Sequence, residues 1–232
     1  MTFPYRTALV IGAGPGISAA VAARLRAEGV GVGVAARGME KLRPHAEAIG
    51  AHVFGVDATR EASVAALFEA AQAQLGPIEI VVYNAGARVR GPLAELDPGE
   101  VEKALAANAF GGFLVARQAA KRMLPRAHGA ILFTGATASV KGFAGSAAFA
   151  MGKFALRGLA QSAARELGPQ GIHVAHFIID GAVRSAARAA PSAEPDSTLD
   201  PDAIAQTYLD VLRQPRSAWS QEVEVRPWVE RF

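Results

Sequence analysis

The stretch Thr7-Ala8-Leu9-Val10-Ile11-Gly12-Ala13-Gly14-Pro15-Gly16-Ile17-Ser18 decides the fold. Its first five residues form a short apolar run, which predicts a buried strand over Thr7–Ile11. Three glycines at alternate positions follow at once, and the spacing of Ala19–Glu28 is helical. Glycine lets the backbone turn tightly and approach a phosphate, whose charge a helix N-terminus attracts. A tight turn without a ligand is the alternative, but the position between strand and helix favours a nucleotide site made by Gly12, Gly14, Gly16 and Ile17.

Strand and helix patterns alternate along the rest of the chain. Further strands are predicted at Val30–Ala36, Ala51–Val56, Ile78–Tyr83, Ala130–Thr134, His173–Ile179 and, half exposed, Gln221–Arg226. Helices are predicted at Gly38–Gly50, Glu61–Leu75, Asp97–Met123, Phe149–Leu167 and Pro201–Leu212. This alternation is typical of an α/β fold with a doubly wound parallel sheet. We therefore expect one domain over residues 1–232, with seven strands in the sheet and helices on both of its faces.

The composition argues against several classes of protein and site. The 24 Lys and Arg residues nearly balance the 21 Asp and Glu residues without a basic run, so we expect no nucleic-acid partner. The absence of cysteine excludes disulfides, thiolate catalysis and cysteine-ligated metals, and we expect no metal site. No apolar run is long enough for a membrane span, and the N-terminal stretch is too short and polar for a signal peptide. We therefore expect a cytoplasmic protein without a membrane partner.

The end of the second predicted strand indicates which dinucleotide is bound. A nicotinamide dinucleotide without a 2′-phosphate needs a carboxylate there for its ribose hydroxyls. Here the strand ends in Val34-Ala35-Ala36-Arg37-Gly38, which has no acid but offers one guanidinium for a phosphate. NADP(H) is therefore favoured over NAD(H), with an ordinary surface role for Arg37 as the alternative. Asp57, after the third strand, is expected either to contact the adenine edge or to cap the following turn.

Motifs along nearly the whole chain resemble, in order and spacing, those of the short-chain dehydrogenase/reductase family, whose members have a Rossmann-type fold. These motifs are the Gly12-to-Ile17 loop, Asn84-Ala85-Gly86, Asn108, Phe149-x-x-x-Lys153 and Asp180-Gly181-x-x-x-Ser185. The resemblance implies that Asn108 and Lys153 belong to the active site. It also implies cofactor contacts from Asn84, Ala85, Gly86, Lys153, Gly181, Val183 and Ser185.

The same resemblance identifies two losses. The family's catalytic serine and tyrosine correspond to Ala136 and Phe149, although Thr137 or Ser139 would offer a hydroxyl if the loop is shifted. In the family, the tyrosine protonates the developing alkoxide and the serine binds the carbonyl oxygen. A phenyl ring donates no proton, and losing a positioned general acid costs roughly a hundred- to ten-thousand-fold in rate, about 3–5 kcal/mol. Ordinary ketone reduction is therefore expected to be badly impaired.

Three functions remain open on the sequence alone. An atypical NADP(H) reductase would take a substrate such as an imine or an activated alkene, with Asp180 as a candidate proton donor unless it only stabilises a turn. A non-catalytic NADP(H)-binding pseudoenzyme would act as a sensor or as an oligomer subunit. A scaffold without any ligand is the third reading. The retained glycine loop, Asn84, Asn108 and Lys153 argue against the scaffold, because a lysine on an apolar helix is costly to bury without a partner.

Oligomer and substrate can be anticipated in outline. Helices at Val101–Met123 and Phe149–Leu167 are apolar on more than one face, and the resemblance implies a homodimer or homotetramer through them. The aromatic chain end, Trp228 to Phe232, is expected to pack on the core or on a second subunit. Arg184–Leu199 is expected to be a mobile cover of an open pocket. Its wall is expected to include Phe143, Phe149 and residues near Val89, which favours a small, apolar-leaning substrate.

Overall fold

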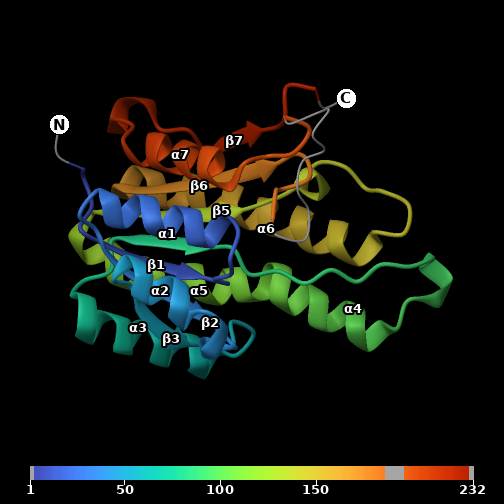
Figure 1. The fold of residues 1–232 in the computed structure, drawn as a ribbon, viewed down its shortest axis with the longest axis horizontal. Helices are drawn as coiled ribbons and strands as arrows, with labels where there is room; N and C mark the ends of the chain where they lie inside the picture. Colours follow the sequence, from blue (N-terminus) through green and yellow to red (C-terminus); the bar gives the residue numbers. More distant parts are fainter. Residues whose placement is uncertain (1–2, 186–195, 230–232) are drawn as a thin grey trace.

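The computed structural model describes residues 3–185 and 196–229. Within these ranges seven parallel strands form one sheet in the order β3-β2-β1-β4-β5-β6-β7 (Figure 1). The strands are β1 (Thr7–Ile11), β2 (Gly31–Ala36), β3 (His52–Gly55), β4 (Ile80–Tyr83), β5 (Gly129–Thr134), β6 (Ile172–Ile179) and β7 (Glu222–Val225). The predicted doubly wound parallel sheet is confirmed.

Helices cover both faces of the sheet. Their bounds are α1 (Ile17–Ala27), α2 (Arg43–Ile49), α3 (Glu61–Leu75), α4 (Pro98–Leu105), α5 (Gly111–Met123), α6 (Ala147–Leu167) and α7 (Pro201–Leu212). One apolar cluster joins the sheet to α1, α2 and α7, and a second joins it to α3, α5 and α6. Alternate residues of each central strand enter opposite clusters, because successive side chains of a strand point to opposite faces.

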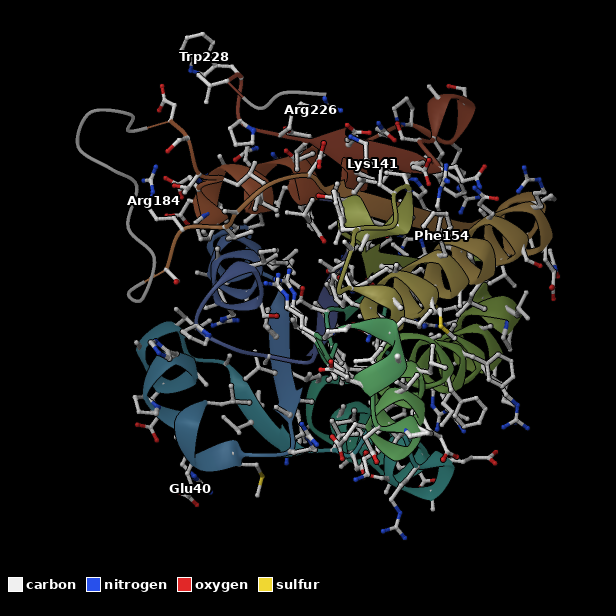
Figure 2. The ribbon with its side chains drawn as sticks, turned by 90° about the vertical axis from the view of Figure 1, so that its right-hand side faces the viewer. Glu40, Lys141, Phe154, Arg184, Arg226 and Trp228 are labelled. Carbon is white, nitrogen blue, oxygen red and sulfur yellow. The ribbon has the colours of Figure 1, made fainter. Side chains whose placement is uncertain are left out.

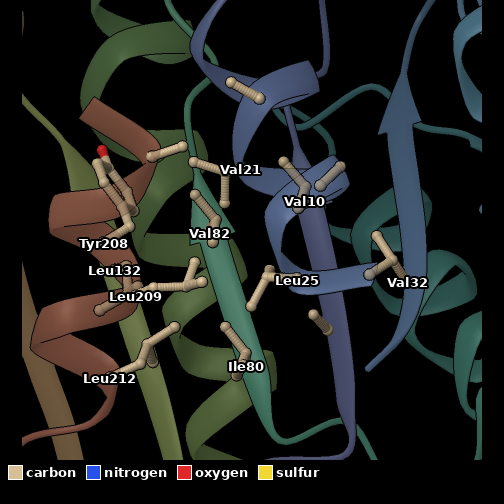
Figure 3. Packing of buried hydrophobic residues seen from close by; sticks show 14 of the residues in the cluster. Val10, Val21, Leu25, Val32, Ile80, Val82, Leu132, Tyr208, Leu209 and Leu212 are labelled. Carbon is tan, nitrogen blue, oxygen red and sulfur yellow. The ribbon is translucent and has the colours of Figure 1, made fainter. Parts of the chain in front are cut away.

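Figure 3 shows the packing of the first cluster. The cluster includes Val10 of β1, Val82 of β4, Val21 of α1 and Tyr208 of α7, all four of them fully buried. Leu9 and Val81, one position earlier on the same strands, belong to the second cluster. Central strands buried on both faces explain why their sequences are continuously apolar rather than alternating.

Two predicted helices differ from the structure. The stretch Gly38–Gly50 begins with a 3₁₀ turn at Met39–Lys41, and the α-helix starts only at Arg43, beside Pro44 in its first turn. The predicted helix Asp97–Met123 is divided into α4 and α5 by a π-helical turn over Ala106–Phe110. Both stretches are helical in composition, so local sequence does not reveal the changes of pitch.

The π-helical turn is held by buried polar groups. The hydroxyl of Tyr83, at the end of β4, donates a hydrogen bond to the Ala107 carbonyl at 2.6 Å. Asn108, at the centre of the turn, is 0% exposed and packs against Gly152 of α6. A Cβ at Gly152 would lie 2.5 Å from the Cβ of Asn108. Helix α6 therefore approaches the turn only because Gly152 has no side chain.

The C-terminal aromatic prediction is only partly within the described residues. Trp228 is 82% exposed and extends from the edge of the molecule (Figure 2), and its Nε1 donates to Asp196 Oδ2 at 3.3 Å. It therefore does not pack on the core of this chain. Phe232, and residues 186–195 of the predicted cover, lie outside the described residues.

Replacing Gly152 by alanine should lower the free energy of unfolding by about 1–3 kcal/mol, because the new methyl group collides with buried Asn108. Gly168→Ala, after the end of the same helix, is the control. Gly168 has φ −56° and ψ −49°, and a Cβ there meets no atom within 4 Å. The control should gain about 0.4–1 kcal/mol. Urea denaturation measures both, and equal effects of the two changes would show that Gly152 is no steric requirement.

Candidate functional site

The candidate site lies at the carboxyl ends of the strands, where β1 and β4 are neighbours and the strand order reverses. The loop after β1 and the loop after β4 touch there. A Cβ at Gly12, whose φ is +82°, would collide with the backbone nitrogen of Ala85. Asn84 connects the same loops, since its Nδ2 donates to Ser18 Oγ at 2.7 Å. Sequence reasoning named Gly12, Asn84 and Ala85 but missed Ser18, because serine at that position has no distinctive spacing.

The glycine loop has room for a phosphate group. No atom lies within 4 Å of the place where a Cβ of Gly14 or Gly16 would stand. Both residues line a pocket of about 250 Å³ together with Ile17, Val183 and Ser185. The first turn of α1 has no acidic residue. An open cradle at a helix N-terminus fits a pyrophosphate, and side chains at these glycines would fill it.

A second pocket, of about 240 Å³, is lined by Gly12, Arg37, Asp57, Ala85 and Gly86 among others. Asp57 Oδ1 accepts hydrogen bonds from the Thr59 hydroxyl at 2.7 Å and the Thr59 N–H at 3.0 Å. These bonds, with a smaller contribution from Arg37, lower the pKa of Asp57. Asp57 thus caps its own turn and also faces the pocket that would hold an adenosine, so the two readings of this residue are compatible.

Lys153 lies at the wall of a cleft that has a volume of about 600 Å³. It is 5% exposed, and its Nζ donates to the Thr134 carbonyl, at the end of β5, at 2.8 Å. Burial, with a contribution from the charge of Arg88, lowers the pKa of Lys153 to about 8. The ammonium group has three donors, so this geometry can also serve ligand hydroxyls at the cleft wall.

Asn108 lies behind the cleft rather than in its lining. Its Nδ2 donates to the Ala87 carbonyl at 2.7 Å, and its Oδ1 accepts from the Ala87 N–H at 3.3 Å. A Cβ at Gly86 would lie 2.9 Å from the same Oδ1. Asn108 therefore fixes the segment after β4, which carries predicted cofactor contacts, and does so through backbone groups.

The cleft brings together residues that were predicted for the cofactor contacts and residues that were predicted for the substrate wall. It is lined by Asn84, Gly86, Ala136, Thr137, Phe143, Phe149, Lys153, Gly181 and Val183, and also by Ile17, Arg88, Arg90, Thr134, Gly135, Ala138, Ser146, Ile179 and Ala182. The same cleft is thus lined by Ala136, Phe149 and Lys153. Val89, expected in the wall, is not in the lining, whereas Arg88 and Arg90 on either side of it are.

The two proposed replacement hydroxyls have different positions. Thr137 lines the cleft. Ser139 is fully buried beneath the loop, where its Oγ accepts a hydrogen bond from the Ala136 N–H at 3.1 Å and lies 3.3 Å from His176 Nε2. Of these two residues, only Thr137 therefore lines the cleft.

Asp180 is not among the residues that line the cleft, although its neighbours Ile179 and Gly181 are. Its carboxylate lies 3.6 Å from Arg226 Nη2, and its N–H donates to the Val225 carbonyl at 2.9 Å. The side chain thus joins the end of β6 to the end of β7. The geometry gives Asp180 a structural contact in place of the proton-donor position that the sequence suggested.

A partly buried polar network that the sequence did not reveal anchors the loop after β5. His176 Nδ1 lies 3.3 Å from Glu222 Oε2, and Arg157 of α6 binds both oxygens of Glu222 at 2.7 Å. Burial is the main cause that lowers the pKa of His176 to about 4, so the imidazole is neutral at pH 7. Through Ser139, this network ties the cleft loop to β6, β7 and α6.

Two absences concern the described residues alone. In residues 3–185 and 196–229, no group of three or more His, Asp or Glu side chains is arranged to hold a metal ion. Among the same residues, no helix is long and apolar enough to cross a membrane.

Comparison with known proteins agrees with this geometry. The family model described as short chain dehydrogenase matches residues 6–195. A protein named as an uncharacterized oxidoreductase of Staphylococcus aureus is 30% identical over 228 residues, which cover 96% of this chain and 97% of that protein. A crystal structure of a short-chain dehydrogenase from Rhodopseudomonas palustris has a TM-score of 0.83 and 40% identity, covering 96% of this chain and 99% of the other.

A metagenomic short-chain oxidoreductase in complex with NADP also has a TM-score of 0.83, at 30% identity, and the match covers 97% of this chain and 98% of that one. The strand order, the glycine loop after β1, the Asn84 segment after β4 and the buried Lys153 of α6 thus occur together in a chain that the family model matches over most of its length. The chain belongs to the short-chain dehydrogenase family of oxidoreductases.

Proposed function

We propose that the protein binds NADP(H) and transfers hydride to an activated alkene, a substrate whose reduction does not require a phenolic proton donor. The observation that carries this proposal is a set of three pockets that share Asn84 in their linings and that include Arg37, the glycine loop and Lys153. The NADP complex of the metagenomic relative supports the choice of cofactor. When bound, NADPH would supply the hydride.

The residues of this chain would hold the cofactor by ordinary electrostatics. Gly14, Gly16 and the first turn of α1 would bind the pyrophosphate, and Arg37 would pair with a 2′-phosphate. Lys153 would donate to the ribose hydroxyls beside the nicotinamide. The remaining contacts would come from residues that line the three pockets: Gly12, Ile17, Asp57, Asn84, Ala85, Gly86, Gly181, Val183 and Ser185.

The charge of the cleft decides between the two substrate classes that the sequence left open. Among the described lining residues, Arg88, Arg90 and Lys153 are basic and none is acidic. A cationic iminium would be repelled by this wall, whereas an alkene conjugated to a carbonyl gains negative charge on its oxygen as hydride arrives. Besides the hydride, the reduction needs one proton, which water in the cleft can supply to the negatively charged product of hydride transfer. The activated alkene is therefore the better candidate.

A non-catalytic NADP(H) sensor is the second candidate, and one observation favours it. Ala136 and Phe149, which the family resemblance places at the serine and tyrosine positions, both line the cleft and provide no hydroxyl there. A panel of electron-poor alkenes offered to the NADPH-bound protein separates the two candidates, because a sensor oxidises NADPH with none of them.

Cofactor choice is tested by titrating the protein with NADPH and NADH and following nicotinamide fluorescence. NADPH should bind on the order of tenfold or more tighter than NADH, because Arg37 pairs with the extra phosphate. Arg37→Ala should weaken NADPH binding by a similar factor and leave NADH unchanged. Arg165→Ala, at the far end of α6, is the control. Absence of binding by either cofactor would overturn the proposal.

We further propose a homodimer or homotetramer built on the faces of α5 and α6. Four large apolar side chains are exposed on this part of the molecule, namely Phe110, Phe113, Met151 and Phe154. The rings of Phe110 and Phe113 stack on each other with centroids 6.0 Å apart, so these two exposed side chains form one apolar surface. The family resemblance supports a second copy of the chain as the partner.

Phe154→Glu should convert the oligomer to a monomer in analytical ultracentrifugation, because it places a carboxylate in the apolar patch. Leu93→Glu, which alters an exposed apolar side chain outside α5 and α6, is the matched control and should leave the oligomer intact. A wild-type protein that sediments as a monomer at micromolar concentration would contradict this proposal.

A further inference from the structure

Two arginines in the cleft have no role in the cofactor contacts described above. Arg88 and Arg90 both line the 600 Å³ cleft. Neither belongs to the pocket around Gly14 and Gly16 or to the pocket around Arg37, where the phosphates of a dinucleotide would lie. Both guanidinium groups are positively charged, so a cleft that they line together attracts an anion.

Arg88 lies over the ring of Phe149, the residue at the position of the family's catalytic tyrosine. Its guanidinium carbon lies 4.6 Å from the centroid of the Phe149 ring, and Lys153 Nζ lies 5.8 Å from the same centroid. A guanidinium that stacks on an aromatic face keeps its N–H groups in its own plane, at the edge of the stack. Phe149 thus supports a planar donor in the substrate half of the cleft, where a tyrosine would instead offer one hydroxyl.

The backbone on both sides of the pair is fixed. Ala87, which precedes Arg88, is held through both its N–H and its carbonyl by Asn108. Gly91, which follows Arg90, donates to the Gly145 carbonyl at 3.1 Å and so joins the loop that carries Phe143. A segment fixed at both ends presents its side chains with less loss of conformational entropy on binding.

We infer that the substrate carries a carboxylate, which Arg88 and Arg90 bind while its apolar part lies against Phe143 and Phe149. This inference rests on the proposed function, because it concerns the substrate of the same cleft. A carboxylate accepts two parallel N–H bonds from a guanidinium, which fixes orientation as well as position. The sequence-based expectation of an apolar-leaning substrate then applies to only one part of the molecule.

The test compares a keto acid with its neutral ester. 3-Benzoylpropionate has a phenyl ring, a ketone and a carboxylate, and its methyl ester differs only in charge. Isothermal titration into the NADP⁺-bound protein should show the acid binding on the order of tenfold or more tighter than the ester. The variants Arg88→Gln and Arg90→Gln should each weaken binding of the acid by a comparable factor and leave binding of the ester unchanged. The control variant Arg165→Gln should change the affinity for neither compound.

The same titrations separate failure of this inference from failure of the proposed function. If NADP⁺ does not bind, the proposed function itself falls. If NADP⁺ binds but acid and ester bind equally, or if both arginine variants keep the wild-type ratio, the carboxylate site is overturned. Far-ultraviolet circular dichroism and NADP⁺ affinity verify that each variant is folded. Should Arg88→Gln fail this check, Arg90→Gln decides alone, because its side chain has no described contact with Lys153 or Phe149.

Discussion

The two hydrogen bonds between the Asn108 carboxamide and the backbone of Ala87 are the contact on which the cleft depends. Asn108 reaches Ala87 because the π-helical turn displaces it from the regular helix, and α6 can approach because Gly152 leaves room. The contact fixes the segment after β4, in which Gly86 precedes Ala87 and Arg88 follows it. The buried carboxamide of Asn108 thus contributes both to the packing of α6 and to the position of the segment that lines the cleft.

Around this contact the two halves of the site have different chemical characters. The half toward the glycine loop has the open cradle, the helix N-terminus and the buried ammonium group of Lys153 that a dinucleotide requires. The half that we propose for the substrate has Ala136 and Phe149 at the two family positions, with Thr137 and two arginines beside them. Electrostatic stabilisation by guanidinium groups can replace hydrogen bonding by hydroxyls where the substrate is anionic, because it acts on charge rather than on one oxygen.

Much of the fold was predictable from local sequence. The bounds of α3, α7 and β1 match the predictions, since each is a strongly periodic or apolar run with clear end signals. The π-helical turn was not predictable, because Ala106–Phe110 has an ordinary helical composition and the turn is held by Tyr83, which is distant in sequence. Tertiary contacts overrode local preference there.

In the site, too, local motifs were predictable from the sequence and features that depend on tertiary contacts were not. Residues in motifs, such as Gly14, Asn84 and Lys153, lie together as expected. Asp180 was a candidate proton donor because of its place in the Asp180-Gly181 motif, but its carboxylate lies beside Arg226, which follows β7. Apolar residues near Val89 were expected in the wall, whereas Arg88 and Arg90 line the cleft from this segment. Side-chain direction in a loop depends on long-range contacts, here those of Asn108 and Gly145, which a linear pattern does not contain.

Our proposal is that the cofactor half of the site is complete, while the substrate half lacks a hydroxyl at Ala136 and Phe149, the positions that the family resemblance gives to the catalytic serine and tyrosine. Its most direct test is NADPH oxidation with 3-benzoylpropionate as the ketone, measured for the wild-type protein and for the double variant Ala136→Ser/Phe149→Tyr. The account predicts that both bind NADPH and that the variant reduces the ketone at least about a hundredfold faster. Equal rates, or a folded and NADPH-bound variant without ketone reduction, would contradict it.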